Sequence, residues 1–168
     1  MSSKENGRRK FLTKAAQGSG LVAGVLVVAE SAVAAPKEGA AKKRAVTLPG
    51  QKTASGLPFS PAIQFGNLVF VSGQIALDPA TQKLASGTIQ DQVRQCLENV
   101  KAVVEASGSS MDKVLKCTVF LTDIANFQAM NEVYRGYFPT DPPARSTVAV
   151  KGLAAGTPIE IECIAYTA

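Results

Sequence analysis

The chain has 168 residues, of which 46% are hydrophobic and 18% charged, so it can bury one core of ordinary size. It contains no histidine, which excludes Ser-His-Asp and Cys-His nucleophile pairs and nearly every zinc or non-haem iron site. The net charge of +5 belongs to the first 44 residues, because residues 45–168 carry nine basic and ten acidic side chains and net −1. For the folded part we therefore expect no metal and no nucleic-acid partner.

Residues 1–34 have the three parts of an export signal. Adjacent Arg8 and Arg9 precede an apolar pair in the twin-arginine pattern, and an uncharged run follows. Ala32-Val33-Ala34 then offers a cleavage site of the A-x-A type. The alternative is an uncleaved anchor, but the apolar part at 21–29 is short for a bilayer, so we expect no stable membrane insertion. The leader predicts a bacterial protein that the twin-arginine export machinery delivers to the periplasm.

A flexible linker is expected after the leader. Residues 35–45 are small, basic and aperiodic, which is typical of a tether. This division leaves residues 46–168 as a single domain.

The first half of this domain predicts a strand followed by a helix. A β-rich run occupies residues 67–75, and 78–81 has turn composition. Thr88 is the expected N-cap of a helix, with Asp91 at the capping-box position. The apolar residues that follow are spaced as one face of a helix ending at 107–108: Ile89, Val93, Cys96, Leu97, Val100, Val103 and Val104.

The second half predicts a strand, a helix and two more strands. Residues 114–121 alternate as a half-buried strand, and Asp123 or Asn126 can cap a second helix that ends before Pro139. Strands are expected at 146–150 and 159–166. These elements predict an α+β fold in which the helices gather on one side of a mixed sheet.

The chain has three cysteines, Cys96, Cys117 and Cys163, with apolar neighbours. We expect three buried thiols, since free cysteine is among the most buried residue types. In an oxidising compartment one pair can still form a disulfide, and the sequence does not select it.

Two short segments carry candidate chemistry. Arg145 lies just before an expected strand and after a rigid proline turn, and its planar guanidinium suits bidentate capture of a carboxylate. Glu160 and Glu162 share one face of the last strand, and Ser72 offers a hydroxyl near the end of the first one. Taken singly, the arginine and the two glutamates fit a solvated surface better than they fit a site.

Together these segments resemble one protein family. Six motifs occur in its order: GNLVFVSGQI at 66–75, QCLENV at 95–100, FLTD at 120–123, FP at 138–139, PARS at 143–146 and IEIE at 159–162. From about residue 57 to 166 the chain resembles the Rid family of reactive intermediate deaminases, which is also called YjgF-like or L-PSP endoribonuclease.

This resemblance implies a chorismate-mutase-like (YjgF-like) protomer with a mixed sheet and two helices on one face, assembled as a homotrimer with clefts between subunits. It implies hydrolysis of 2-imino acids and their enamine tautomers to 2-oxo acids and ammonium, without metal or cofactor. In that reaction Arg145 grips the substrate carboxylate and Glu160 positions or activates water. Ser72 and Asn131 then line the pocket.

The sequence departs from the family pattern at two positions. Phe59 stands where archetypal members have tyrosine, so the missing hydroxyl predicts weaker placement of water or imine and a shifted substrate range. Thr147 stands where many members have cysteine, which removes a thiol mechanism but leaves that residue's backbone groups available. Two other functions stay open: a binding module that holds a 2-oxo acid without turnover, and a ribonuclease or translation inhibitor. The charge of the domain and the export signal argue against the last.

Overall fold

The computed structural model describes residues 41–48, 56 and 58–168. The expected export signal and residues 35–40 of the expected linker lie outside these residues. Within the described part of the chain, no helix combines the length and apolar character needed to cross a membrane.

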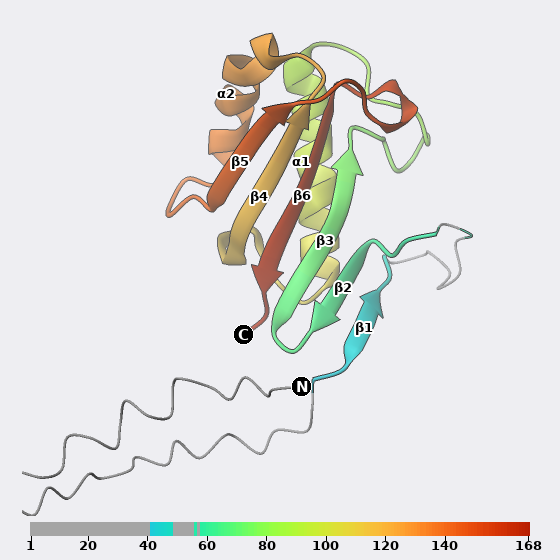
Figure 1. The fold of residues 1–168 in the computed structure, drawn as a ribbon, viewed down its shortest axis with the longest axis vertical. Coiled ribbons are helices and arrows are strands. Elements are labelled where there is room, and N and C mark those ends of the chain that lie inside the picture. Colours follow the sequence, from blue (N-terminus) through green and yellow to red (C-terminus); the bar gives the residue numbers. More distant parts are fainter. Residues whose placement is uncertain (1–40, 49–55, 57) are drawn as a thin grey trace, which may run out of the picture. The chain divides into compact units, whose positions relative to one another are not determined.

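The described residues form a six-stranded sheet in the order β1-β2-β3-β6-β4-β5 (Figure 1). The strands are β1 (Lys43–Val46), β2 (Ala62–Phe65), β3 (Leu68–Ile75), β4 (Val114–Leu121), β5 (Ala144–Ala149) and β6 (Ile159–Tyr166). All neighbouring strands are antiparallel except β4 and β5, which are parallel because α2 carries the chain back between them. The sheet is therefore mixed, as the sequence predicts.

Strands β1 and β2 were not expected. Residues 43–45 fall in the expected linker, whereas β1 pairs with β2 in register and buries Val46 in the core. A flexible linker running to residue 45 is therefore wrong at its end. The composition misleads because an edge strand commonly carries exposed basic side chains, as Lys43 and Arg44 do here.

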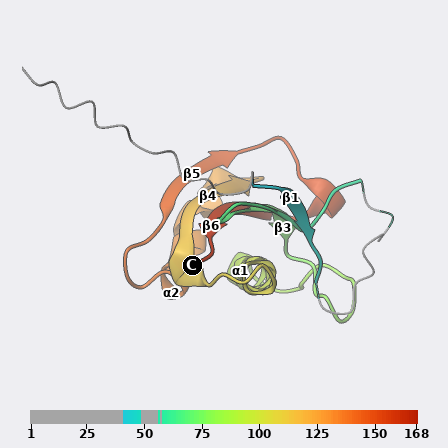
Figure 2. The same cartoon turned by 90° about the horizontal axis from the view of Figure 1, so that it is seen from below.

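Both helices pack on the same face of the sheet (Figure 2). Helix α1 (Ile89–Ala106) has the expected capping box, in which the Thr88 hydroxyl accepts from the Asp91 N–H and the Asp91 carboxylate accepts from the Thr88 N–H. Helix α2 (Phe127–Tyr137) follows a 3₁₀ turn, Ile124–Asn126, whose Ala125 N–H donates to the Asp123 carboxylate. Asp123 rather than Asn126 therefore makes the side-chain cap, and it caps the turn instead of the helix.

The core lies between the sheet and the helices. Alternate residues of β4 and β6 are buried, so one face of each strand is apolar and meets α1. All three cysteines are free and buried in this layer, which confirms the expected core thiols. Burial raises the pKa of the Cys96 and Cys163 thiols well above the usual range.

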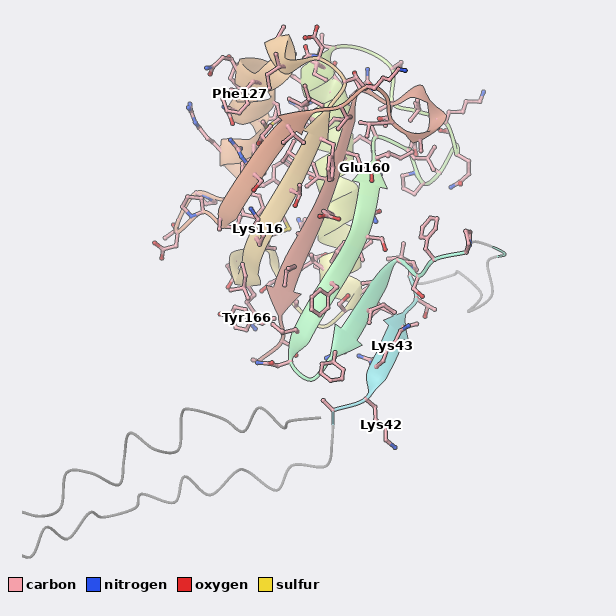
Figure 3. All side chains as sticks on the ribbon, in the orientation of Figure 1. Lys42, Lys43, Lys116, Phe127, Glu160 and Tyr166 are labelled. Carbon is pink, nitrogen blue, oxygen red and sulfur yellow. The ribbon has the colours of Figure 1, made fainter. Side chains whose placement is uncertain are left out.

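Among the described residues no helix covers the opposite face of the sheet, and we call it the open face. Figure 3 labels Lys116 and Glu160 on this side, which is turned away from α1. Phe70 and Val148 expose 43% and 44% of their surface, and a hollow of about 160 Å³ is lined by Phe70, Lys116, Thr118, Glu162 and their neighbours. Nearly half-exposed apolar side chains beside charged ones make this face a candidate interaction surface.

Candidate functional site

Arg145 lies on the helix side of edge strand β5. Its register partner on β4 is Cys117, which is fully buried beneath the helices, and paired residues of adjacent strands share a face of the sheet. The half-buried guanidinium therefore reaches α2 and not the open face. The strand starts at Ala144 rather than at 146, so Arg145 is held by strand pairing.

Four side chains of α2 surround this guanidinium. The Nη2 group donates to Oδ1 of Asn131 at 2.7 Å, and Nη1 points to the Met130 sulfur at 3.8 Å. The Cζ atom lies 4.5 Å from the centre of the Tyr134 ring and 5.7 Å from that of Phe127. We call these five residues the arginine cluster. The helix residues are spaced i, i+3, i+4 and i+7, so they form one stripe of α2.

No carboxylate neutralises Arg145 within the part of the chain that the structure describes, where the ion pair is Arg94–Asp91 on the surface. Three of the five guanidinium N–H groups also find no hydrogen-bond acceptor among these residues. A half-buried cation with an orienting amide and free donors is suited to a planar anion, above all a carboxylate.

Ser72, Gly73 and Glu160 form a second group on the open face, which we call the glutamate cluster. The pairing of β3 with β6 shifts register between Val71 and Gln74, which places a bulge at Ser72 and Gly73. The Ser72 hydroxyl donates to the Ser60 carbonyl at 2.7 Å. A methyl group on Gly73 would lie 1.9 Å from Oε1 of Glu160, so the carboxylate rests directly against the glycine backbone.

The environment of Glu160 favours its neutral form. Burial raises the pKa of this carboxyl above its ordinary value, and the nearby negative charge of Glu162 adds to the effect. A carboxylate with a raised pKa is a stronger base than an ordinary surface glutamate, which suits it to accept a proton from water.

The structure places the two departures from the family pattern beside these clusters. Phe59 is 56% exposed and directly precedes Ser60, the acceptor for Ser72. Thr147 lies two residues beyond Arg145, on the same side of β5, and its buried hydroxyl has no hydrogen-bond partner among the described residues.

The two clusters do not meet within one chain. Glu160 pairs with Phe120 and Arg145 with Cys117, so β4 lies between them and they belong to opposite faces of the sheet. Three residues along β4 and two strand spacings separate their backbones by about 10 Å in each direction. The structure therefore brings Arg145 together with Asn131, and Ser72 together with Glu160, in two separate clusters.

Part of each cluster has no signal of its own in the sequence. Phe127, Met130 and Tyr134 have the spacing of one apolar helix face, which does not distinguish a contact with a guanidinium from ordinary core packing. The close approach of Gly73 to Glu160 depends on the pairing of β3 with β6, which the local sequence does not show. Among the described residues no group of three His, Cys, Asp or Glu side chains is placed to hold a metal ion.

The mixed sheet, the two helices on one face and the oriented arginine at the sheet edge define a protein of the YjgF type of α+β fold. Residues 50–167 match the sequence model described as Endoribonuclease L-PSP, and the chain belongs to this family, which is also called YjgF or Rid.

Three relatives illustrate the similarity. RutC family protein PH0854 of Pyrococcus horikoshii is 50% identical over 109 residues, which are 65% of this chain and 86% of that protein. Reactive Intermediate Deaminase A, chloroplastic, of Arabidopsis thaliana is 44% identical over 74% of this chain and 66% of that protein. The crystal structure of E. coli TdcF with bound serine is 37% identical, with a TM-score of 0.67 over 74% of this chain and 99% of that one. Of these three, the Arabidopsis protein is named a deaminase, and membership of the Rid family supports a deaminase function in general terms.

Proposed function

We propose that this protein is an exported, metal-independent deaminase that hydrolyses 2-imino acids and their enamine tautomers to 2-oxo acids and ammonium. The observation that carries the proposal is Arg145, a half-buried guanidinium that neutral groups orient and that no described carboxylate neutralises. The reaction needs a fixed substrate carboxylate, because an imine carbon is already electrophilic and its protonated form more so.

In this mechanism Arg145 binds the carboxylate and Glu160 acts as the base. Water adds to the carbon of the protonated imine while Glu160 accepts one of its protons, which gives a carbinolamine. Glu160 returns that proton to the nitrogen. The C–N bond then breaks as the C=O bond forms, and the hydroxyl proton passes through Glu160 to the departing ammonia. The products are one 2-oxo acid and one ammonium ion.

A homotrimer would complete the site. The two clusters lie on opposite faces of the sheet, and a cleft between neighbouring subunits would face the arginine cluster of one copy with the glutamate cluster of the next. The exposed Phe70 and Val148 support burial of the open face in such an assembly. Analytical ultracentrifugation tests the proposal, since a monomer that turns over substrate would contradict it.

Two positions adapt the site to its substrate. Thr147 cannot act as a thiol nucleophile, and its buried hydroxyl has no hydrogen-bond partner among the described residues. Phe59 offers an exposed apolar ring where a hydroxyl is usual, so it favours imines with larger apolar side chains.

Delivery to the periplasm rests on the twin-arginine leader. Replacing Arg8 and Arg9 by lysine together should leave the protein in the cytoplasm of a bacterial host, as fractionation would show. Unchanged delivery by the double variant would contradict this route.

The deaminase is tested with the purified full-length chain. An amino-acid oxidase generates 2-imino acids from alanine, leucine or methionine, and the rate of imine loss is followed with and without the protein. We expect faster loss that disappears in Arg145→Ala.

A second function, small-carboxylate binding without turnover, is favoured by the serine bound in TdcF and by the missing hydroxyl at Phe59. It predicts that 2-oxo acids bind through Arg145 in calorimetry while imine loss is not accelerated.

A further inference from the structure

Tyr134 contacts the charged group of Arg145 with its ring and not with its hydroxyl. The ring centre lies 4.5 Å from the guanidinium carbon, and the side chain is 5% exposed. Its hydroxyl is buried without a hydrogen-bond partner among the described residues. A buried polar group without a partner destabilises the fold, so the ring is what this position contributes to its surroundings.

The ring is itself held in place. The Phe138 ring lies 4.7 Å away, centre to centre, and is tilted by 40°. Asn131 meanwhile accepts a hydrogen bond from one end of the guanidinium. One contact therefore fixes the plane of the cation and the other its rotation within that plane.

We propose that Tyr134 is a positioning residue for carboxylate recognition. Its ring, supported by Phe138, holds the Arg145 guanidinium in one plane so that the free N–H groups meet both oxygens of a planar carboxylate together. This inference rests on the proposed function, because it concerns the same arginine. It assigns to Tyr134 an electrostatic task beyond the packing of a core residue.

The attraction between cation and ring gives the proposal its test. An aromatic ring attracts a cation through its quadrupole, and the attraction is strongest where water is excluded. Removing the ring should leave the arginine in several orientations, of which few bind a carboxylate. Substrate binding weakens as a result, whereas the bond-breaking steps at the imine carbon do not change.

The first experiment compares two substitutions in the full-length chain. Tyr134→Phe keeps the ring and should retain the wild-type KM for imine hydrolysis. Tyr134→Leu should raise KM by about three- to thirtyfold while kcat stays within about twofold. The Kd of a 2-oxo acid, measured by calorimetry, should rise in parallel, and this readout does not depend on turnover.

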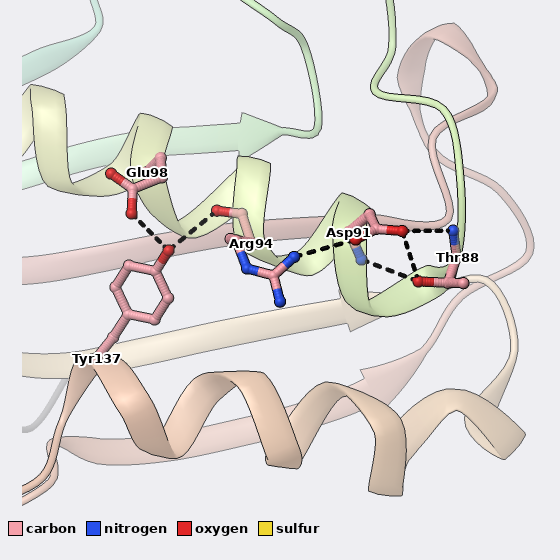
Figure 4. A network of polar contacts seen from close by, with 5 residues as sticks. All are labelled: Thr88, Asp91, Arg94, Glu98 and Tyr137. Atoms are coloured by element: carbon pink, nitrogen blue, oxygen red, sulfur yellow. Dashed lines mark hydrogen bonds and ion pairs between the residues drawn. The ribbon is translucent and has the colours of Figure 1, made fainter.

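Tyr137→Leu is the matched control. Tyr137 lies on the same helix but donates a hydrogen bond from its hydroxyl to Glu98 on α1 at 2.6 Å (Figure 4), and it is not among the residues found in contact with the Arg145 guanidinium. It should lose stability with KM and Kd unchanged. Equal changes of KM in the two leucine variants would overturn the proposal, because helix loosening alone would then explain them.

A second series of variants at position 134 keeps the size and shape of the ring, so that the variants still fold. Phenylalanine with one, two or three ring fluorines at position 134 weakens the ring quadrupole stepwise at nearly constant volume. We expect KM and Kd to rise with each fluorine. Values that stay flat across the series would overturn the proposal even if Tyr134→Leu does not fold.

Arg145→Ala separates this inference from the proposed function. If that variant still hydrolyses imines and binds 2-oxo acids as the wild type does, the proposed function fails and the role of Tyr134 fails with it. If Arg145→Ala loses both while the fluorinated series stays flat, only the positioning role is wrong.

Discussion

The arginine cluster and the glutamate cluster are built by different means on the two faces of one sheet. On the helix side, side chains from a single stripe of α2 enclose the cation. On the open face, the carboxylate of Glu160 rests on a bulged backbone that only glycine permits. The arginine cluster therefore depends on side chains that contact the guanidinium, whereas the glutamate cluster depends on Gly73 having no side chain. The first is broken by truncation and the second by addition of a methyl group.

Truncation at Arg145 should have the largest effect. Arg145→Lys keeps the charge but not the planar pair of donors, and we expect kcat/KM to fall by about 10²- to 10³-fold in the imine assay. Arg94→Lys is the control, since Arg94 pairs with Asp91 on the surface and should keep wild-type activity. Wild-type turnover by Arg145→Lys would show that the cluster does not bind substrate.

The second-largest loss of activity is expected from adding a methyl group at Gly73. Gly73→Ala places a methyl group 1.9 Å from Oε1 of Glu160, so the carboxylate must move, and kcat should fall by about tenfold or more. At Gly136, in α2, an added methyl group meets nothing within 4 Å, so Gly136→Ala should keep activity and raise stability by about 1 kcal/mol. Equal activities of the two variants, measured by imine loss and thermal unfolding, would remove Glu160 from the mechanism.

A smaller effect is expected on the pH dependence of activity, in the acidic range where Glu160 ionises. Glu160 works as a base in its ionised form, and burial together with the Glu162 charge raises its pKa. Activity should therefore rise with pH through a range above that of an ordinary glutamate. Glu162→Gln removes the like charge, which lowers the pKa of Glu160 and moves this rise in activity to lower pH.

The control for this shift is Glu98→Gln, whose carboxylate accepts from Tyr137 in the network of Figure 4. That variant should leave the rise in activity at the same pH. A rise that does not move in Glu162→Gln would mean that another group controls the pH dependence.

Loss of a helix cap should change stability alone. The Thr88 hydroxyl accepts from the Asp91 N–H at 3.3 Å, and Thr88→Ala should lower the free energy of unfolding by about 1 kcal/mol. Because α1 contributes no side chain to either cluster, kcat and KM should be unchanged. A denaturant titration beside the imine assay checks both statements.

Sequence patterns predicted those elements that are determined by interactions between residues close together in the chain. The capping box and apolar spacing gave α1 closely, and alternation gave β4 and β6 with their observed bounds. Strand β1 could not be predicted from its own four residues, because they form a strand only through long-range pairing with β2. The residues wrongly assigned to the linker, 43–45, are thus those that pair with residues 63–65 of β2.

The site was predicted less completely than the fold. Arg145, Asn131, Ser72 and Glu160 all lie in one of the two clusters, but nothing in their order along the chain tells which face each would take. That depends on the register of β5 and β6 against β4, which many weak contacts set together. Tyr134 was invisible as a functional residue because a ring under a guanidinium has the same helical spacing as a ring in a core.

The three buried thiols allow local unfolding of the domain to be measured by chemical labelling. Cys96, Cys117 and Cys163 are 0%, 0% and 2% exposed, and Cys96 also donates to the Gln74 carbonyl beneath the bulge that carries Gly73. An alkylating reagent can reach them only when the layers separate, so labelling rates measure the free energy of that separation. Mass spectrometry of each labelled cysteine would show whether the bulge at the end of β3 opens before the middle of the sheet, without any engineered probe.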